Sequence, residues 1–150
     1  MSLNIDIDRF CLTLARQAPD AIVYADAEGV IRFWNCGAER IFGFAEAEAL
    51  GRSLDIVIPE RLRERHWQGY GETMRTGRTR YGAGEILAVP AVRKDGTRIS
   101  IEFTILPFCD DVGRMIGIAA ILRDVTARFE EMRELRKQLA DAQARGREDP

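Results

Sequence analysis

The sequence contains one histidine, His66. Leu62, Tyr70 and Met74 lie at four-residue intervals on either side of it, so the four side chains share one face of a helix. We therefore predict a helix over residues 60–76 with His66 directed towards the core. A neutral imidazole in an apolar cavity can coordinate a metal ion through one ring nitrogen while a hydrogen bond orients the other. The alternative is a structural histidine without a ligand.

The pattern of apolar residues predicts the elements that must position this helix. In chain order these are an amphipathic helix (7–18), two strands joined by a turn (21–25 and 30–34), short helices (38–50), the helix 60–76 and three strands (85–92, 98–105 and 115–122). The strand 98–105 alternates apolar and polar side chains, and 115–122 is almost continuously apolar, as in a central strand covered on both faces. We expect an α+β fold with one antiparallel sheet of five strands.

Composition limits the classes of function. The chain has 150 residues, of which 46% are hydrophobic, enough for one domain, and 22 basic and 24 acidic side chains give a net charge of −2. We expect no binding to nucleic acid or to a membrane, because there is no cationic field and no apolar run of about 20 residues. A soluble, cytoplasmic protein is predicted. The three cysteines, Cys11, Cys36 and Cys109, are expected to be reduced and buried.

The last part of the chain, residues 127–150, is predicted to be a helical linker whose final residues fray. A heptad seam runs along it and is interrupted by Arg128; its apolar members are Val125, Met132, Leu135, Leu139 and Ala142. A second copy could cover this seam, which predicts a homodimer through a coiled coil. The alternative is a helix that folds back on its own sheet.

Three motifs resemble those of the PAS family of sensory domains. They are Asn35-(x)3-Glu39-(x)3-Gly43-Phe44, the hairpin Arg93-Lys94-Asp95-Gly96-Thr97 and the exit sequence Asp124-Val125-Thr126. The resemblance covers about residues 18–126 and divides the chain into an N-terminal helix (1–18), a PAS domain (19–126) and a linker (127–150). It implies a five-stranded PAS fold with short helices and one long helix, no reaction of its own, and output through a domain or partner not in this chain. It also implies that Asp124 and Thr126 couple the domain to the linker.

A narrower resemblance concerns His66. The stretch 59–66, followed by Gly77, is similar to the helix of haem-containing PAS oxygen sensors, which implies that His66 would be the iron ligand. The residues that would line the cofactor site with it are Tyr70, Ile101, Phe103 and Ile116. The following stretch, 81–87, lacks the arginine that such sensors place opposite the iron, and Arg80 comes too early to replace it. This departure argues against oxygen sensing.

Other ligands are ranked by the motifs that the chain lacks. Residues 51–55 replace the Asn-Cys-Arg motif of light-sensing flavin PAS domains, so a flavin adduct is not expected. A flavin bound without an adduct, a small metabolite or a fatty acid stays compatible with the sequence.

Two functions are compatible with these patterns. The first is a sensory module that binds a small ligand or cofactor and relays a conformational change to its C-terminal helix. The second is a cofactor-free PAS module for dimerisation. An enzyme is not expected, because catalysis would need Glu85 and Glu102 to act together and Glu102 is predicted to face away from the core.

Overall fold

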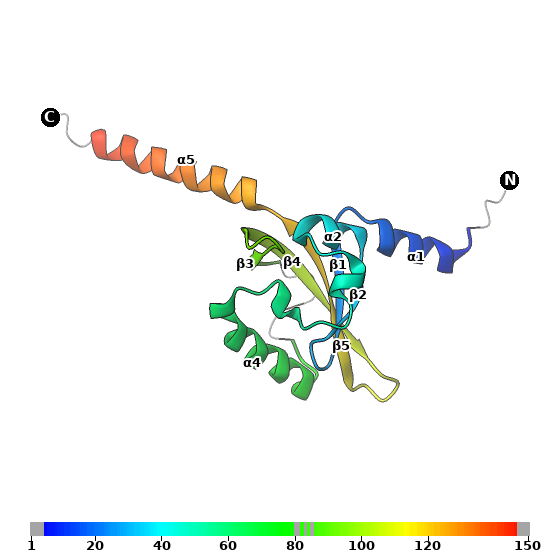
Figure 1. The fold of residues 1–150 in the computed structure, drawn as a ribbon. Helices are drawn as coiled ribbons and strands as arrows, with labels where there is room; N and C mark the ends of the chain where they lie inside the picture. The colour runs from blue at the N-terminus through cyan, green and yellow to red at the C-terminus, as the bar shows by residue number, and fades with distance from the viewer. Residues whose placement is uncertain (1–4, 80–81, 83, 85, 147–150) are drawn as a thin grey trace.

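The computed structural model describes residues 5–79, 82, 84 and 86–146, and these contain one antiparallel sheet with the strand order β2-β1-β5-β4-β3 (Figure 1). The strands are β1 (Ala21–Asp26), β2 (Ile31–Trp34), β3 (Leu87–Val92), β4 (Arg98–Cys109) and β5 (Met115–Asp124). The predicted α+β class and the five-stranded antiparallel sheet are confirmed. The predicted strand 85–92 is present from Leu87, and Glu85 lies outside the described residues.

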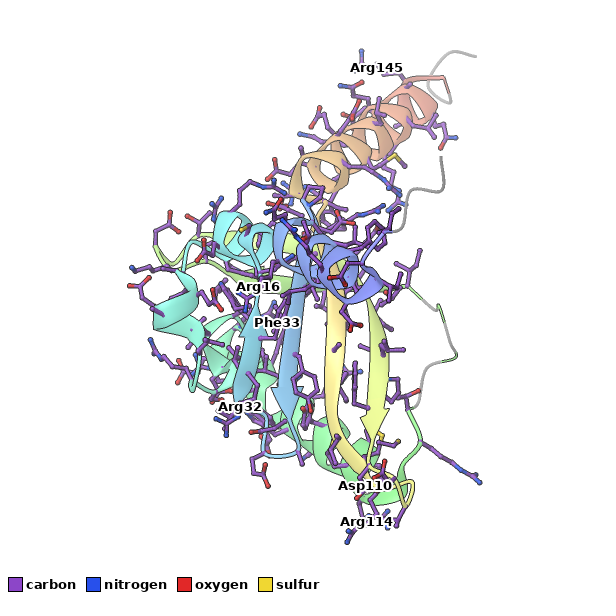
Figure 2. All side chains as sticks on the ribbon, turned by 90° about the vertical axis from the view of Figure 1, so that its right-hand side faces the viewer. Arg16, Arg32, Phe33, Asp110, Arg114 and Arg145 are labelled. Carbon is purple, nitrogen blue, oxygen red and sulfur yellow. The ribbon has the colours of Figure 1, made fainter. Side chains whose placement is uncertain are left out.

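The described helices follow the predicted order. They are α1 (Ile7–Gln17), α2 (Cys36–Phe42), α3 (Glu46–Ala49), the 3-10 turn η1 (Leu54–Ile56), α4 (Glu60–Thr76) and α5 (Thr126–Arg145). Helices α4 and α1 lie on opposite sides of the sheet, and α5 projects away from it as a straight arm (Figures 1 and 2). None of the residues of α5 is buried, so the alternative in which this helix folds back on the sheet is wrong.

Local chemistry sets the ends of the helix that carries His66. Pro59 precedes the first residue of α4, where its fixed φ angle suits the entry into a helix. Gly77 ends the helix in the left-handed region at φ 68°, and its N–H donates to the carbonyl of Thr73. The predicted bounds of 60 and 76 are confirmed.

The core lies on the face of the sheet that α4 and α2 cover. On β1 this face carries the buried residues Ala21, Val23 and Ala25. The register of the sheet aligns Ala21 with Leu122 of β5, and Leu122 with Phe103 of β4. The odd-numbered residues of β4 therefore face the core, as predicted, with Ile99, Ile101, Phe103 and Ile105 buried or half-buried.

Strand β5 is central in the sheet, but it is not covered on both faces. Ile116 and Ile121 are 43% and 45% exposed, so this part of the prediction is wrong. Because Leu122 faces the core and successive side chains of a strand alternate between faces, Ile121 lies on the sheet face opposite the core. Ile116 has no partner on β4, because the register shifts so that Phe108 pairs with Gly117 and Cys109 with Met115. An unbroken apolar run gives no sign of such a shift.

The cysteines also differ from expectation. Cys11, Cys36 and Cys109 are all exposed free thiols, on α1, α2 and β4 respectively. Cys36 occupies the first position of α2, where its side chain precedes the buried positions of that helix. The prediction of burial is wrong because Cys11 lies on a helix with no buried residue, Cys36 at the start of α2, and Cys109 at the exposed end of β4.

In the described part of the chain, no helix combines the length and the apolar character that crossing a membrane requires.

Candidate functional site

His66 lies in the middle of α4, half-buried, as the helical spacing predicts. Its Nδ1 atom is fully buried and has no hydrogen-bond partner among the described residues. Burial lowers the pKa of His66, and the nearby carboxylate of Asp55 partly opposes this shift. The ring is therefore held neutral near pH 7, which is the form that can accept a hydrogen bond or coordinate a metal.

Two aromatic neighbours attach this part of α4 to the turn between β1 and β2. The hydroxyl of Tyr70 donates to the carbonyls of Asp26 at 2.6 Å and of Ala25 at 3.2 Å. Burial, followed by the nearby charge of Asp26, raises the pKa of Tyr70 well above its usual value, so this donor keeps its proton. The Nε1 of Trp67 donates to Asp55 at 2.8 Å, with its ring against the sheet edge at the β1–β2 turn.

Gly29 is the point of closest approach between this turn and α4. It adopts φ +76°, and a Cβ atom there would lie 2.2 Å from two carbons of the Trp67 ring. Glycine is therefore favoured at this position for two reasons: the backbone angle is positive, and a Cβ atom would collide with Trp67. This contact fixes the height of α4 above the sheet and with it the position of His66.

The predicted cofactor residues are only partly brought together. The rings of His66 and Tyr70 have centroids 5.7 Å apart. Ile101 is buried and Phe103 half-buried on the core face of β4, whereas Ile116 is exposed.

The register separates the aromatic pair on α4 from the β4 residues. Through the sheet register, Phe103 lies beside Ala21, whereas Tyr70 bonds to Ala25. Ala21 and Ala25 are four residues apart on β1, which corresponds to about 13 Å along the strand. The core face between these two levels is lined by Val23, Ala25 and Ala120. These side chains are small and apolar, so they offer a ligand no hydrogen bond.

The residues predicted to couple the domain to its linker form a hydrogen-bonded junction. The hydroxyl of Thr126 donates to Asp124 at 2.5 Å and accepts from the N–H of Ser100 on β4 at 2.9 Å. The N–H of Val125 donates to the carbonyl of Ser100 at 2.9 Å. Arg128 on the first turn of α5 lies 3.8 Å from Glu102. The start of α5 is thus fixed to two neighbouring strands.

Asn35 was identified in the sequence only as part of a motif, and its structural role was missed. It is 2% exposed, and its Oδ1 accepts from the N–H groups of Ile22 and Ala38. Its Nδ2 donates to three carbonyls, those of Ala15, Ala18 and Asp20. One side chain therefore joins the end of α1, the start of β1 and the first turn of α2. Its place before a predicted helix was the available signal, since asparagine is a preferred cap.

Clustered metal ligands are not found in the described ranges: no three His, Cys, Asp or Glu side chains lie close enough to hold an ion. Arg80, which the sequence analysis set aside as too early in the chain, and Tyr81, the first residue of the stretch 81–87, lie outside the described residues.

Comparison with known proteins agrees with the fold. A family model described as "PAS fold" matches residues 15–130. The chain belongs to this family of PAS domains. Three features of the structure agree with this family: the order of the strands, the helix α4 across one face of the sheet, and the passage from β5 into α5 through Asp124 and Thr126.

Individual relatives are longer proteins. Sensor protein FixL of Bradyrhizobium diazoefficiens is 36% identical over 87 residues, which are 58% of this chain and 17% of that protein. An uncharacterized protein of Azorhizobium caulinodans is 30% identical over 119 residues, 79% of this chain and 16% of that protein. The chain spans about a sixth of the length of these relatives.

Among solved structures, a PAS domain from Colwellia psychrerythraea has a TM-score of 0.70 at 24% identity. That likeness covers 81% of this chain and 99% of the solved one, and it concerns the fold.

Proposed function

We propose that this PAS domain is a sensory module in which a small molecule binds beside His66 and changes the packing of α5. The observation that carries the proposal is the buried, unpartnered Nδ1 of His66. Buried polar atoms in folded proteins nearly always have a partner, so an orphan in a half-buried side chain is a candidate for ligand contact. The similarity to part of sensor protein FixL supports the same class of function.

A continuous path of contacts supports the relay. The Tyr70 hydroxyl bonds to the carbonyls of Ala25 and Asp26, and these residues pair with Ile118 and Gly117 of β5. Strand β5 then runs to Asp124 and into α5 without an intervening loop. A ligand that moves α4 therefore acts on the strand that leads into the exit helix.

The energetic demand on such a ligand is small. A ligand that binds one arrangement about 100-fold more tightly than another shifts their balance by about 2.7 kcal/mol. That exceeds the contribution of one or two ordinary hydrogen bonds at the Thr126 junction. Two packings of α5 that differ by a few such bonds can be exchanged by a ligand of ordinary affinity.

Haem is one ligand that the resemblance implies, and His66 would hold it. The neutral imidazole fits as a donor to iron, whereas no described residue makes the hydrogen bond that usually orients such a ligand. When bound, haem iron supplies a coordination position for a diatomic gas. On the protein side, the rings of Trp67 and Tyr70 lie beside His66, and Phe103 would supply apolar surface further along the sheet.

A cofactor-free dimerisation module is the second candidate. Its support is the exposed apolar surface of the two terminal helices, namely Ile7, Phe10 and Leu14 on α1 and Phe129, Met132, Leu135 and Leu139 on α5. Pairing of two copies would remove this surface from water. The sensor proposal requires an occupied site at His66, whereas this second candidate requires a dimer and no ligand.

Native mass spectrometry and absorbance of the purified 150-residue chain separate the two candidates. The sensor proposal predicts a bound small molecule, or uptake of added hemin with a Soret band, in the wild type and in Arg65→Ala, a matched change at an exposed position of α4. His66→Ala should lose it. A wild type that carries no small molecule and takes up no hemin contradicts the sensor proposal.

Sedimentation tests the second candidate on the same preparation. Leu135→Asp should convert a dimer to a monomer, while the neighbouring exposed change Gln138→Asp should not. A wild-type chain that is monomeric at high concentration contradicts the dimerisation module.

A further inference from the structure

A pocket lies at the base of α5, and His66 is not among its lining residues. It has a volume of about 460 Å³, and four segments distant in sequence form it: the entry to β1, the end of α2, the β3–β4 hairpin and the end of β5. Its lining residues are Pro19, Asp20, Arg40, Ile41, Arg93, Arg123 and Asp124. Three of the seven are arginines, and each comes from a different element.

Backbone carbonyls hold two of these arginines in place. The Nη2 of Arg40 donates to the carbonyl of Pro19. The Nη2 of Arg93 donates to the carbonyl of Arg40 at 3.3 Å. A guanidinium has five N–H donors, so one bond leaves most of its hydrogen-bonding capacity unused. Neither side chain forms an ion pair with a carboxylate among the described residues.

The hairpin that carries Arg93 is itself well fixed. The N–H of Lys94 donates to the carbonyl of Phe42 at 2.8 Å, and the Nζ of Lys94 lies 2.5 Å from Glu48. The backbone N–H of Arg93 donates to the carbonyl of Thr97 at 2.9 Å. These bonds hold the backbone from which the Arg93 side chain extends towards the pocket.

The charges of the pocket leave a positive excess. Arg123 donates to Asp20 at 2.9 Å, which pairs one cation with one anion. The Oδ1 of Asp124 accepts from the hydroxyl and the N–H of Thr126. The three arginines and two aspartates of the lining leave an excess of one positive charge, and Arg40 and Arg93 are the two cations without a carboxylate partner among the described residues. An oxyanion bound in the pocket would offset this positive excess and use the free N–H donors of the guanidiniums.

We propose that this pocket binds a small oxyanion, a carboxylate or a phosphate group, through Arg40 and Arg93. A planar guanidinium matches the two oxygens of either group. Ile41 supplies an apolar wall, and the volume suits a small metabolite. The site is separate from the proposed ligand site at His66.

The location gives this site a consequence for signalling. The same pocket contains Arg123 and Asp124, the last two residues of β5 before the junction with α5. A bound anion competes with Asp20 for Arg123 and adds negative charge beside Asp124. Occupancy therefore alters the hydrogen bonds that fix the first turn of α5, independently of His66.

NMR titration of the 150-residue chain at constant ionic strength tests the proposal, with inorganic phosphate in one arm and succinate in the other. We expect saturable shifts of the backbone amides of Arg93, Lys94, Arg123 and Asp124 in at least one arm, and the arm that saturates at lower concentration identifies the preferred group. Arg93→Gln and Arg40→Gln should each weaken binding about tenfold or more.

Arg114→Gln is the matched control. Arg114 is exposed and pairs with Asp110 at the hairpin between β4 and β5, at the end of the sheet remote from α5 (Figure 2). This variant and His66→Ala should bind the anion as the wild type does, so the result is independent of the sensor proposal. Shifts that stay linear in both arms, or equal affinity in Arg93→Gln, Arg40→Gln and Arg114→Gln, would overturn the proposal.

Discussion

Asn35 and His66 are both polar residues with buried side-chain atoms, but they differ in their hydrogen bonds. Asn35 makes five hydrogen bonds that join α1, β1 and α2. The buried Nδ1 of His66 makes none in the described part of the chain. Since burial of a polar atom without a partner costs free energy, the first residue stabilises the fold and the second lowers its stability. The difference separates a structural region from a candidate ligand site.

The largest expected effect is at Asn35. In Asn35→Ala the N–H groups of Ile22 and Ala38 lose their acceptor, so the free energy of unfolding should fall by about 3 kcal/mol. Urea denaturation measures the change. Gln138→Ala on the exposed face of α5 is the control and should leave the midpoint unchanged. A loss below about 1 kcal/mol for Asn35→Ala would remove the contrast between the two regions.

The next effect concerns the attachment of the His66 helix. Gly29→Ala forces a Cβ atom into the Trp67 ring and also strains a left-handed backbone, so we expect a loss of about 2–3 kcal/mol. Gly51→Ala is the matched control, because Gly51 has φ +81° but no atom within 4 Å of the added Cβ. It should lose only about 1 kcal/mol. Equal losses in thermal or urea unfolding would show that the Trp67 contact is not tight.

A smaller effect is expected at the exit junction. Thr126→Val removes the acceptor of the Ser100 N–H and one donor to Asp124, which should cost about 1 kcal/mol and speed hydrogen exchange at the Ser100 amide. Thr104→Val, on the same sheet face of β4 as Ser100, is the control. Unchanged exchange at Ser100 in Thr126→Val would argue against a coupling role for this residue.

The smallest effect on stability is expected at His66 itself. His66→Leu removes an unsatisfied nitrogen and keeps apolar volume, so the free energy of unfolding of the ligand-free chain should change by less than about 1 kcal/mol. Denaturation by urea at pH 7.5 measures it, with Leu62→Ala, an apolar truncation on the same helix face, as the comparison. A large loss in His66→Leu would identify a structural histidine after all.

The pH dependence of stability sharpens the same contrast. Burial lowers the pKa of folded His66 below its usual value of 6.5, so the unfolded chain binds more protons between these two values. Stability should therefore be complete above about pH 6.5 and decrease as the pH falls towards the lowered pKa. His66→Leu should lack this component, and because His66 is the sole histidine, the difference between the two chains isolates it. Parallel stability curves from pH 7.5 to pH 5 would contradict the burial of the ring.

Much of this fold could be predicted from local patterns, because the spacing of apolar residues differs between helices and strands. The bounds of α4 and the inward position of His66 followed from a four-residue spacing with Pro59 and Gly77 at its ends. The exposure of Ile116 could not be predicted, since it depends on a register shift that one strand alone does not encode.

The remaining features depend on contacts between distant segments. The five bonds of Asn35 involve residues up to 20 positions away, and the pocket with Arg40, Arg93 and Arg123 combines segments more than 80 positions apart. Only the folded chain places these groups together. Residue types and spacing therefore predict elements and faces, whereas hydrogen-bond networks and surface pockets require the structure.

Hydrogen exchange at the junction tests the central claim most directly. The chain as purified with its bound molecule would be compared with the same chain stripped under mild denaturant and refolded, at the amides of Ser100, Val125 and Phe129. The account predicts that occupancy beside His66 changes exchange at these amides severalfold, and that His66→Ala behaves as the stripped protein in both preparations. Identical exchange at the junction in the bound and stripped wild type would contradict the link between α4 and α5.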